Sequence, residues 1–380
     1  MQDPCSPERG SSSGRSPGRV GGTKDWGGFP ASLGELKAVT TISDRTTIED
    51  KFQRPFRDLR VSVTDRCNFR CTYCMPAEIY GERYEFLPRA DLLTFEEIER
   101  LTRIMAGLGA VKVRLTGGEP MVRSDVEQLV EMLASVEGIE DLTMTTNGYL
   151  LPNKAQALKD SGLHRLSISL DSLDDEVFKK MNGRGFSTAK VLDGIAAAER
   201  AGFNPVKINS VVQRGVNDHT VVDMARYFKE RGHIMRFIEY MDVGTRNGWE
   251  LEHVVPADEI VARIDAEMPL EPVEGDYRGE VAARYRYRDG GGEIGVIASV
   301  TKPFCGDCTR LRLSPEGRLV TCLFATLGTD LRTPLRADAS DAELTDLVTK
   351  VWGVREDRYS EERASMTEPR EKVEMYHIGG

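Results

Sequence analysis

The first residues suited to chemistry are three closely spaced cysteines, Cys67, Cys71 and Cys74, in the segment CNFRCTYC. Three thiolates at C-x3-C-x2-C spacing can wrap around one small metal cluster. A closed structural zinc site takes four ligands, and no fourth cysteine or histidine stands nearby. A 4Fe–4S cluster held by three cysteines leaves one iron open to an external ligand. A zinc knuckle completed by a distant residue is the alternative, but the spacing is unusual for zinc and favours an iron–sulfur cluster.

A second triplet, Cys305, Cys308 and Cys322, has the spacing C-x2-C-x13-C. It also lacks an obvious fourth ligand, because His377 is the one histidine that follows it and nothing in the sequence brings that residue close. One incomplete triplet is compatible with a zinc site that misses a ligand. Two separated triplets favour two clusters, each with an open iron. An open iron that faces a cavity can bind a substrate directly.

Polar and glycine-rich turns follow several of the strands that the sequence predicts. The turn Gly117-Gly118-Glu119-Pro120 is one of them. Glycines at such a place let the backbone approach a ligand and leave N–H groups free to bond a carboxylate. Taken alone, this segment favours an ordinary turn. Ser169, at the end of the run SISL, is suited to bond a ribose or a carboxylate, and a simple strand-end cap is an equal alternative.

Basic residues occur at unusual places, inside or directly after β-rich runs. Lysine and arginine are rarely buried unless they are paired. Near the ends of several parallel strands, such side chains would build a pocket for a polyanion such as a phosphate chain. The alternatives are a solvated face or internal ion pairs with acids such as Glu119 or Glu239. The residues concerned are Arg60, Lys112, Arg114, Lys207, Arg236, Arg310 and Arg312.

The elements that must position these residues are six short β-rich runs that alternate with helical segments. The helical segments carry apolar residues at helical spacing, as in 95–108 and 126–133. This alternation predicts a parallel sheet with helical crossovers, whose active site gathers at the C-terminal strand ends. A partial barrel and an open doubly wound sheet both fit the pattern. The runs are Leu59–Val63, Lys112–Leu115, Leu142–Thr145, Arg165–Ser169, Val206–Val211 and Met235–Ile238.

The chain divides into three regions by pattern. We expect residues 1–50 to be a disordered leader, because its first part is rich in Gly, Ser and Pro and poor in apolar residues. Cys5 lies in it and is expected to be a bystander. Residues 51–242 hold the βα rhythm, which fades in residues 243–380. That last region shows two β-like runs and a helix, at Val281–Tyr287, Ile294–Val300 and Ala342–Trp352.

Composition limits the function classes. The chain has 380 residues, with 51 basic against 61 acidic side chains, which gives a net charge of −10. Such a charge argues against a general binder of nucleic acids or membrane surfaces. No apolar run approaches the ~20 residues of a membrane span, and clustered cysteines indicate a reducing compartment. We expect a cytoplasmic, bacterial protein; an organellar transit peptide, suggested by Arg9, Arg15 and Arg19, is the less favoured interpretation.

These motifs carry a family resemblance. The first triplet, with an aromatic residue before its last cysteine, resembles the hallmark of the radical S-adenosylmethionine (SAM) superfamily. Together with RLTGGEP, TTNGYLL, RFIEYMDVG, FCGDCTRLRL and the terminal Gly-Gly, the sequence closely resembles the GTP 3′,8-cyclase family. This enzyme begins molybdenum cofactor biosynthesis. The resemblance covers roughly residues 58–380, and the second triplet, TRLRL and the diglycine are its family-specific parts.

The resemblance implies an incomplete parallel (β/α)6-type TIM barrel with a C-terminal iron–sulfur cluster-binding extension. It implies two 4Fe–4S clusters, one on each triplet: the first cleaves SAM, and the second binds the guanine base. The positions that match SAM contacts are Tyr73, Gly118, Ser169 and Met241. Those that match GTP contacts are Arg60, Arg114, Thr145, Lys207, Arg310 and Arg312, to which pocket geometry adds Lys112 and Arg236.

The same resemblance implies conversion of GTP to 3′,8-cyclo-7,8-dihydro-GTP, with an electron donor and, as the next enzyme, cyclic pyranopterin monophosphate synthase. A homodimer remains open. It also favours insertion of Gly379 and Gly380 into the active site over a frayed tail or a sulfur-carrier-like terminus, with Tyr376 and Ile378 as anchors. Two other functions compete: a different radical SAM enzyme with an auxiliary cluster, such as a peptide-modifying one, and a non-enzymatic metal-binding module.

Overall fold

The computed structural model describes residues 47–363 and 371–380. The expected leader lies outside these residues up to position 46, as does Cys5. The structure contradicts the expected end of this leader at residue 50. Ile48 is buried in the core and Asp50 is also buried, while Glu49 forms a β-bridge with Pro55. Residues 47–50 therefore belong to the folded domain and not to the expected leader.

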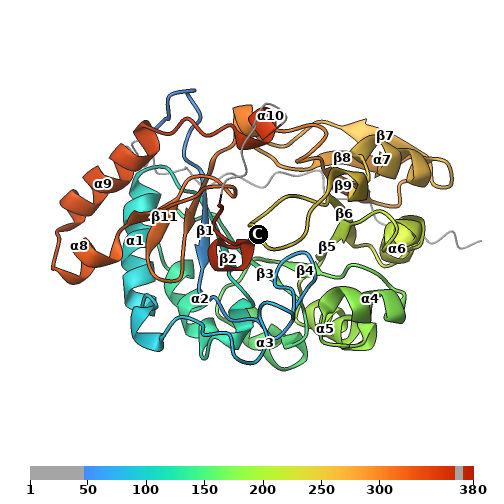
Figure 1. Cartoon of the computed structure of the whole chain (residues 1–380), viewed down its shortest axis with the longest axis horizontal. Coiled ribbons are helices and arrows are strands. Elements are labelled where there is room, and N and C mark those ends of the chain that lie inside the picture. The colour runs from blue at the N-terminus through green and yellow to red at the C-terminus, as the bar shows by residue number, and fades with distance from the viewer. Residues whose placement is uncertain (1–46, 364–370) are drawn as a thin grey trace, which may run out of the picture. The chain divides into compact units, whose positions relative to one another are not determined.

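Six parallel strands form the centre of the fold, and each lies within a residue or two of the predicted run. Helices connect successive strands and lie outside them in Figure 1. The strands are β1 (Asp58–Ser62), β2 (Lys112–Thr116), β3 (Asp141–Thr146), β4 (Arg165–Ser169), β5 (Lys207–Val212) and β6 (Ile234–Glu239). The helices are α1 (Phe95–Gly107), α2 (Val126–Ala134), α3 (Leu151–Asp160), α4 (Asp175–Asn182), α5 (Thr188–Arg200) and α6 (Val221–Glu230).

Local sequence explains where these helices begin and which face they bury. Thr94 caps α1, because its side chain accepts a hydrogen bond from the Glu97 N–H while the Glu97 carboxylate accepts one from the Thr94 N–H. The apolar residues of α1 fall on one side of the helix, and Ile98 and Leu101 on that side are buried. The same capping box recurs at Ser340, where α9 (Asp341–Gly353) begins.

The order of the strands distinguishes the two architectures that fitted the sequence. The parallel strands are neighbours in their sequence order, from β1 to β6. A doubly wound sheet would reverse direction at a switch point, whereas a barrel winds one way throughout. The sheet does not close: its order is β12-β11-β10-β1-β2-β3-β4-β5-β6-β9-β8-β7. The fold is thus the incomplete parallel barrel, as predicted.

The C-terminal region extends the same sheet at both ends. After α7 (Ala257–Asp265), strands β7 (Leu270–Val273), β8 (Ala283–Tyr287) and β9 (Glu293–Ile297) join at β6. Strands β10 (Arg310–Leu313), β11 (Arg318–Val320) and β12 (Thr329–Asp330) join at β1, with β10 parallel to it. The expected division at residue 243 is therefore no break in the sheet. The last helices are α8 (Arg332–Arg336), α9, α10 (Tyr359–Glu362) and α11 (Met375–Ile378).

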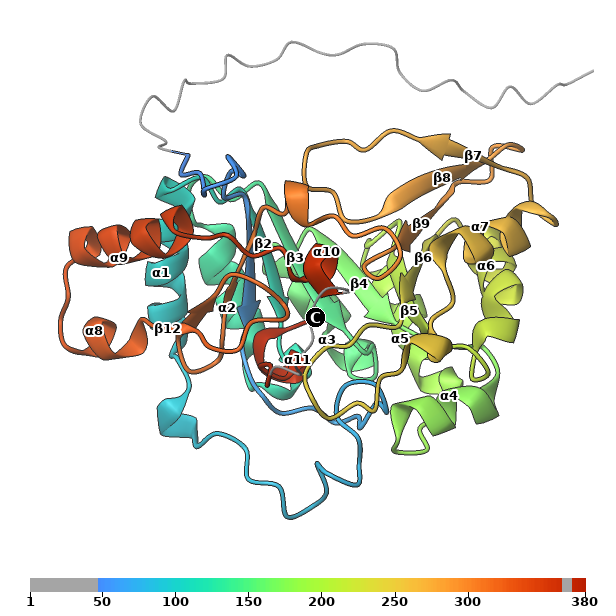
Figure 2. The ribbon, with the colours of Figure 1, turned by 45° about the horizontal axis from the view of Figure 1, so that its top comes forward.

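The final residues of the chain lie at the centre of the strands. Figures 1 and 2 show the C-terminus next to α11, surrounded by β1–β6 and the segments of the C-terminal region. Short one-turn helices complete the connections, at Arg89–Asp91, Pro120–Val122, Asp218–Thr220, Leu251–His253 and Cys305–Asp307.

Candidate active site

One cavity of about 320 Å³ lies inside the incomplete barrel. Side chains from all six parallel strands or their C-terminal loops line it, together with the C-terminal region. The cavity therefore brings together most of the residues that the sequence singled out. Those that line it are Arg60, Cys67, Cys71, Tyr73, Cys74, Lys112, Arg114, Gly118, Thr145, Ser169, Arg236, Met241, Cys308, Arg310, Arg312, Cys322 and Gly380. Cys305, Lys207 and Gly379 are absent from this lining among the described residues.

The first cysteine triplet lies in the loop after β1. Its middle cysteine closes a tight turn, because the Cys71 carbonyl accepts hydrogen bonds from the N–H groups of Cys74 at 2.9 Å and Met75 at 2.8 Å. The Arg70 guanidinium stabilises the loop by donating hydrogen bonds to the carbonyls of Cys67 at 2.7 Å and Tyr80 at 2.6 Å. These hydrogen bonds define the shape of the loop.

The chemistry of these thiols fits an iron–sulfur cluster. Burial raises the pKa of Cys67 to about 12, and burial also raises the pKa values of Cys71 and Cys74. Buried thiols of this kind stay neutral unless a cation compensates the thiolate, which a metal cluster does. Within 47–363 and 371–380, no three Cys, His, Asp or Glu side chains are grouped to hold one metal ion. In a four-iron cluster each cysteine binds a different iron, so the ligands need not converge on one atom.

The glycine turn after β2 differs from the expectation in one respect. Its N–H groups are occupied: Gly118 donates to the Thr64 carbonyl and Glu119 donates to the Arg66 carbonyl, both at 2.8 Å. A Cβ atom on Gly118 would lie 2.2 Å from the Arg66 oxygen, so only glycine permits this contact. The N–H groups of Gly118 and Glu119 are therefore not free to bind a carboxylate, which agrees with the ordinary turn that this segment favours when taken alone.

Glu119 ties this turn to the end of β3. Its carboxylate accepts hydrogen bonds from the Thr146 hydroxyl at 2.8 Å and from the N–H groups of Asn147 at 2.7 Å and Met121 at 3.2 Å. Burial raises the pKa of Glu119 to about 7, although these donors act against the shift. Its bonds are local, which argues against the suggested ion pair with a buried arginine.

The opposite side of the first triplet contacts the ends of β4 and β5. The Tyr73 hydroxyl donates to Asp171 at 2.9 Å, and Asp171 also accepts from the Val211 N–H at 2.9 Å. Burial raises the pKa of Asp171 to about 6. Ser169 and Asn209 are paired in the β4–β5 register, and both line the cavity. A polar wall thus faces the cysteine loop.

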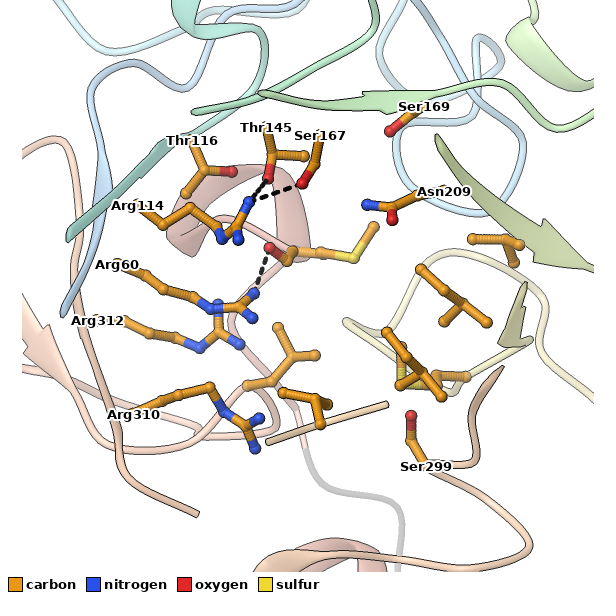
Figure 3. A pocket seen from close by; sticks show the side chains of 18 of the residues that line it. Arg60, Arg114, Thr116, Thr145, Ser167, Ser169, Asn209, Ser299, Arg310 and Arg312 are labelled. Atoms are coloured by element: carbon orange, nitrogen blue, oxygen red, sulfur yellow. Dashed lines mark hydrogen bonds between the residues drawn. The ribbon is translucent and has the colours of Figure 1, made fainter. Parts of the chain in front are cut away.

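Arginines from three adjacent strands form the other wall. Arg60 on β1 is paired in register with Arg312 on β10 and with Arg114 on β2. Figure 3 shows these side chains and Arg310 one above another, with Ser169 and others across the cavity. Arg114 donates to the hydroxyls of Thr145 at 2.9 Å and Ser167 at 3.1 Å. We call Arg60, Arg114, Arg310 and Arg312 the arginine wall.

Charges are balanced in one row of this sheet and unbalanced in the next. One row alternates in sign, since Arg310, Asp58, Lys112 and Asp141 are register partners across β10, β1, β2 and β3. Lys112 lies 3.7 Å from an Asp58 oxygen and 3.4 Å from an Asp141 oxygen. Two residues further along the strands, the row of Arg312, Arg60 and Arg114 contains no acid. For Lys112, the ion-pair alternative is therefore correct.

The arginine wall has no Asp or Glu side-chain partner in the described parts of the chain, although Arg60 and Arg312 donate to main-chain oxygens of Gly380 and Gly379. None of its members forms a salt bridge with an Asp or Glu there, and neither do Lys207 and Arg236. Removal from solvent lowers the pKa of Arg60 well below its usual value, and the nearby arginines lower it further. Glu239, the second suggested partner, instead accepts hydrogen bonds from Ala257, Val300 and Thr301. Buried or partly buried arginines without an Asp or Glu side-chain partner, such as Arg60, Arg114 and Arg312, fit a polyanionic ligand.

Lys207 lies at the start of β5, on the same strand face as Asn209 and Val211, which line the cavity. Burial lowers the pKa of Lys207 to about 7, and the neighbouring cations Arg236, Arg165, Lys112 and Arg114 act in the same direction. Lys207 therefore lies next to the other cations but does not itself line the cavity.

Two of the three cysteines of the second triplet reach the cavity surface. Cys308 and Cys322 line the cavity, whereas Cys305 lies behind them. An Arg310 Nη donates to the Cys308 sulfur at 3.1 Å. Burial acts to raise the pKa of Cys308, but Arg310 and Arg355 outweigh it and lower that pKa to about 6. Burial raises the pKa of Cys322 to about 12. Both triplets thus open onto one cavity.

The C-terminal segment enters the cavity between the triplets. Tyr376 and Ile378 are buried, as expected for anchors. The Gly379 carbonyl accepts a hydrogen bond from Arg312, and the Gly380 carbonyl accepts one from Arg60 at 2.5 Å. Gly379 has a φ of +74°, and a Cβ there would lie 2.1 Å from the Thr116 methyl carbon. The structure therefore places the diglycine on the arginine wall.

Comparisons with known proteins agree with this geometry. A family model described as Radical SAM superfamily matches residues 61–228, and Molybdenum Cofactor Synthesis C matches residues 233–361. A GTP 3′,8-cyclase of Acidothermus cellulolyticus is 51% identical and covers 88% of this chain and 99% of its own. That of Staphylococcus haemolyticus is 47% identical with the same coverage.

The chain belongs to the GTP 3′,8-cyclase family. Membership confirms the family and fold class expected from the sequence, and with them radical SAM chemistry, which uses SAM and an iron–sulfur cluster. Among solved structures, methylornithine synthase is similar with a TM-score of 0.45 at 18% identity, over 56% of this chain and 62% of that one. A TM-score this low supports no conclusion about function. No helix in the described part of this cyclase-family chain is long and apolar enough to cross a membrane.

Several cavity residues of this family member were missed by sequence reasoning. Each is polar, and they lie either within the strands, as Ser167 and Asn209 do, or in the segments that follow strands, as Asn147 and Asp171 do. Nothing in the sequence separated these residues from ordinary strand and turn residues. Ser299 lies near the end of β9, a strand whose position beside β6 the sequence did not indicate. The missed residues include Thr116, Asn147, Ser167, Asp171, Asn209, Tyr277 and Ser299.

Proposed function

We propose that the chain converts GTP to 3′,8-cyclo-7,8-dihydro-GTP by radical SAM chemistry, the first step of molybdenum cofactor biosynthesis. The observation that carries this proposal is the arginine wall, a set of cations without salt bridges to Asp or Glu side chains in the described residues, which lines one cavity together with the first cysteine triplet and with Cys308 and Cys322 of the second. A triphosphate supplies the missing negative charge, and Arg60, Arg114, Arg310 and Arg312 are suited to it because a guanidinium binds phosphate through paired hydrogen bonds.

Two clusters are part of the proposal. Cys67, Cys71 and Cys74 would hold the first, and Cys305, Cys308 and Cys322 the second. When bound with SAM and one donated electron, the first cluster supplies a 5′-deoxyadenosyl radical, and the open iron of the second supplies a ligand position for guanine. We assign SAM contacts to Tyr73, Gly118, Ser169 and Met241, and further GTP contacts to Thr145 and Lys207. The Tyr73 hydroxyl is already oriented by Asp171 at 2.9 Å.

The residues of this chain would contribute to the reaction by orienting the substrate. A hydrogen leaves C3′ of the ribose, a bond forms between C3′ and C8 of guanine, and one electron and one proton complete the dihydro product. Both steps require C3′ to be held against its two reaction partners in turn. The arginine wall would fix the triphosphate at one end of the substrate, and the second triplet would fix the base at the other. The narrow cavity and the inserted C-terminal segment limit access of water.

The proposal assigns residues 51–242 to SAM and residues 243–380 to the second cluster and substrate; a leader would end before Ile48, which is buried in the core. It requires a one-electron donor and a following enzyme, cyclic pyranopterin monophosphate synthase, that consumes the product. A homodimer is compatible with it, and Gly379 and Gly380, whose main-chain oxygens accept from Arg312 and Arg60, would act beside the arginines that bind the triphosphate.

Mass analysis of the products from GTP, SAM and a strong reductant tests the proposal under anaerobic conditions. We expect cyclised nucleotide and 5′-deoxyadenosine, with ATP as the control substrate giving no cyclised product. Iron and sulfide counts on the same sample should reach about eight per chain, as two four-iron clusters require. A lone zinc, or turnover of SAM without any change to GTP, would refute the assignment.

A further inference from the structure

The turn that carries two cysteines of the second triplet has little apolar packing of its own. The one-turn helix Cys305–Asp307 contains no buried residue, and Gly306 and Asp307 are exposed. Apolar contacts therefore contribute little to where this turn sits. Its position must come from polar interactions with the rest of the fold.

Part of this polar support comes from surface contacts, Gly306 N–H to Glu361 at 3.1 Å and Arg278 to Asp307 at 2.8 Å, and the buried part comes from two arginines. Arg54, which is 0% exposed, donates through Nη1 to the Cys305 carbonyl at 2.7 Å and to the Asp357 carbonyl at 2.9 Å. Arg355, which is 4% exposed, donates through Nη1 to the Cys308 carbonyl at 2.7 Å. Each guanidinium thus holds the backbone of one cysteine of the triplet.

One carboxylate joins the two arginines. Asp50 accepts from Arg54 Nε at 2.6 Å and from Arg355 Nη1 at 3.3 Å through the same oxygen, Oδ2. Trp352 contacts both arginines. Its indole N–H donates to the Arg54 carbonyl at 3.1 Å, and its ring lies 4.6 Å from the Arg355 guanidinium. The network links the segment before β1, the cysteine turn and the segment after α9.

The same turn is tied in register to the arginine wall. The Thr309 carbonyl accepts hydrogen bonds from the N–H groups of Arg57 and Asp58, both at 3.1 Å, and its hydroxyl donates to Asp58 at 2.6 Å. Strand β10 begins at the next residue and carries Arg310 and Arg312. The cysteines and the arginines that would contact one substrate are therefore separated by a single anchored residue.

We propose that Asp50, Arg54 and Arg355 form a positioning network that sets the second cysteine turn at a fixed distance from the arginine wall. A cluster on this triplet would then hold the base where the wall can hold the triphosphate. The inference rests on the proposed second cluster. Buried ion pairs are a costly way to add stability, so a network used in place of apolar packing fits a requirement for defined geometry.

The test separates positioning from general stability by comparing two ligands. Inorganic tripolyphosphate probes the arginine wall alone, whereas GTP probes the wall and the second cluster together. The variant is Arg355→Lys in the full chain with both clusters reconstituted anaerobically, because lysine keeps the charge but loses the planar fork. The control is Val348→Ala, a fully buried position in α9 that lies outside the network. Asp50→Asn serves as a second variant in case Arg355→Lys does not fold.

We expect Arg355→Lys to keep the iron count and the tripolyphosphate affinity of the wild type. Its GTP affinity should fall about tenfold, equal to about 1.4 kcal/mol, and GTP should no longer change the electron paramagnetic resonance spectrum of the second cluster as it does in the wild type. The control should leave both affinities in their wild-type ratio.

An unchanged ratio of GTP to tripolyphosphate affinity in both Arg355→Lys and Asp50→Asn overturns the inference. So does an equal loss of both affinities, which would indicate general destabilisation. Failure of the proposed function is visible separately, in the wild-type chain: a single cluster there, or a second cluster that does not respond to GTP, refutes the function and the positioning network together.

Discussion

Replacing Gly379 by alanine should undock the C-terminal segment while leaving the barrel folded. The backbone at Gly379 has a φ of +74°, which costs an alanine about 1–3 kcal/mol. The new Cβ would lie 2.1 Å from the Thr116 methyl carbon, and overpacking of this kind costs about 1–3 kcal/mol more. The sum, about 2–6 kcal/mol, is comparable to the two arginine hydrogen bonds that hold the diglycine, which contribute about 1.5–3 kcal/mol each.

The neighbouring residue provides a matched control. Gly380 has no positive φ, and its nearest neighbour would be the flexible Met375 sulfur at 3.0 Å. Gly380→Ala should therefore be mild. A rescue is also available: Thr116→Ser removes the clashing methyl group, so the double variant with Gly379→Ala should recover part of the lost function but retain the cost of the positive φ.

The assay is the ratio of cyclised nucleotide to 5′-deoxyadenosine under anaerobic turnover. We expect a fall of at least about tenfold for Gly379→Ala, because a penalty of about 1.4 kcal/mol already changes an equilibrium tenfold, and less than about threefold for Gly380→Ala. Carboxypeptidase digestion reports docking directly and should be faster for the first variant alone. Equal ratios for the two variants, or a Gly379→Ala ratio that Thr116→Ser does not raise, would refute the reasoning.

Three further predictions follow from the charges and the cysteines. Arg60→Met should reduce the preference for GTP over guanosine by about tenfold or more, since a charge-assisted hydrogen bond contributes about 1.5–3 kcal/mol. Binding of both ligands is measured by equilibrium dialysis. The control is Arg165→Met, which removes an arginine that is paired with an acid. Because burial and neighbouring cations lower the pKa of Lys207 to about 7, GTP binding above that pH must take up a proton. Affinity should therefore fall as pH rises from 7 to 9, and Lys207→Met should flatten this dependence. For the unliganded protein the sign is opposite: the depressed pKa of Lys207 makes stability rise with pH between about 7 and its unfolded pKa of about 10.4. Cys67→Ala should abolish SAM cleavage, whereas Cys322→Ala should retain part of the SAM cleavage and stop cyclisation. The two reactions are measured together, as 5′-deoxyadenosine and as cyclised nucleotide. Cyclised nucleotide at the wild-type level from Cys322→Ala would mean that the second triplet is structural.

Local sequence determined the elements and the local motifs. Alternation of side chains defines a strand within a few residues of chain, which is why β4 was predicted with the same bounds, Arg165–Ser169, that it has in the structure. The cysteine spacing is equally local, and so is the capping box at Thr94. The resemblance to the cyclase family, confirmed by the comparisons, added the roles that spacing alone left open.

Local sequence did not determine which backbone groups would be free. The glycine turn after β2 looked open to a ligand, but its N–H groups bond to the loop of residues 64–66 that leads to the first cysteine. That contact forms only when two segments about fifty residues apart come together. Lys112 and Arg114 shared a predicted strand face, yet one is ion-paired and the other is not, because their neighbours on β1 and β3 differ.

The arrangement of the site was decided by the insertion of β10 beside β1. This pairing places Arg312 next to Arg60, although about 250 residues separate them, and it carries the second triplet to the cavity of the first. Strand pairing across such a distance depends on which faces bury one another and on register, and neither is encoded in the period of a single strand. The same holds for the network of Asp50, Arg54 and Arg355: its members are ordinary charged residues in sequence, and only burial against the cysteine turn makes them a unit.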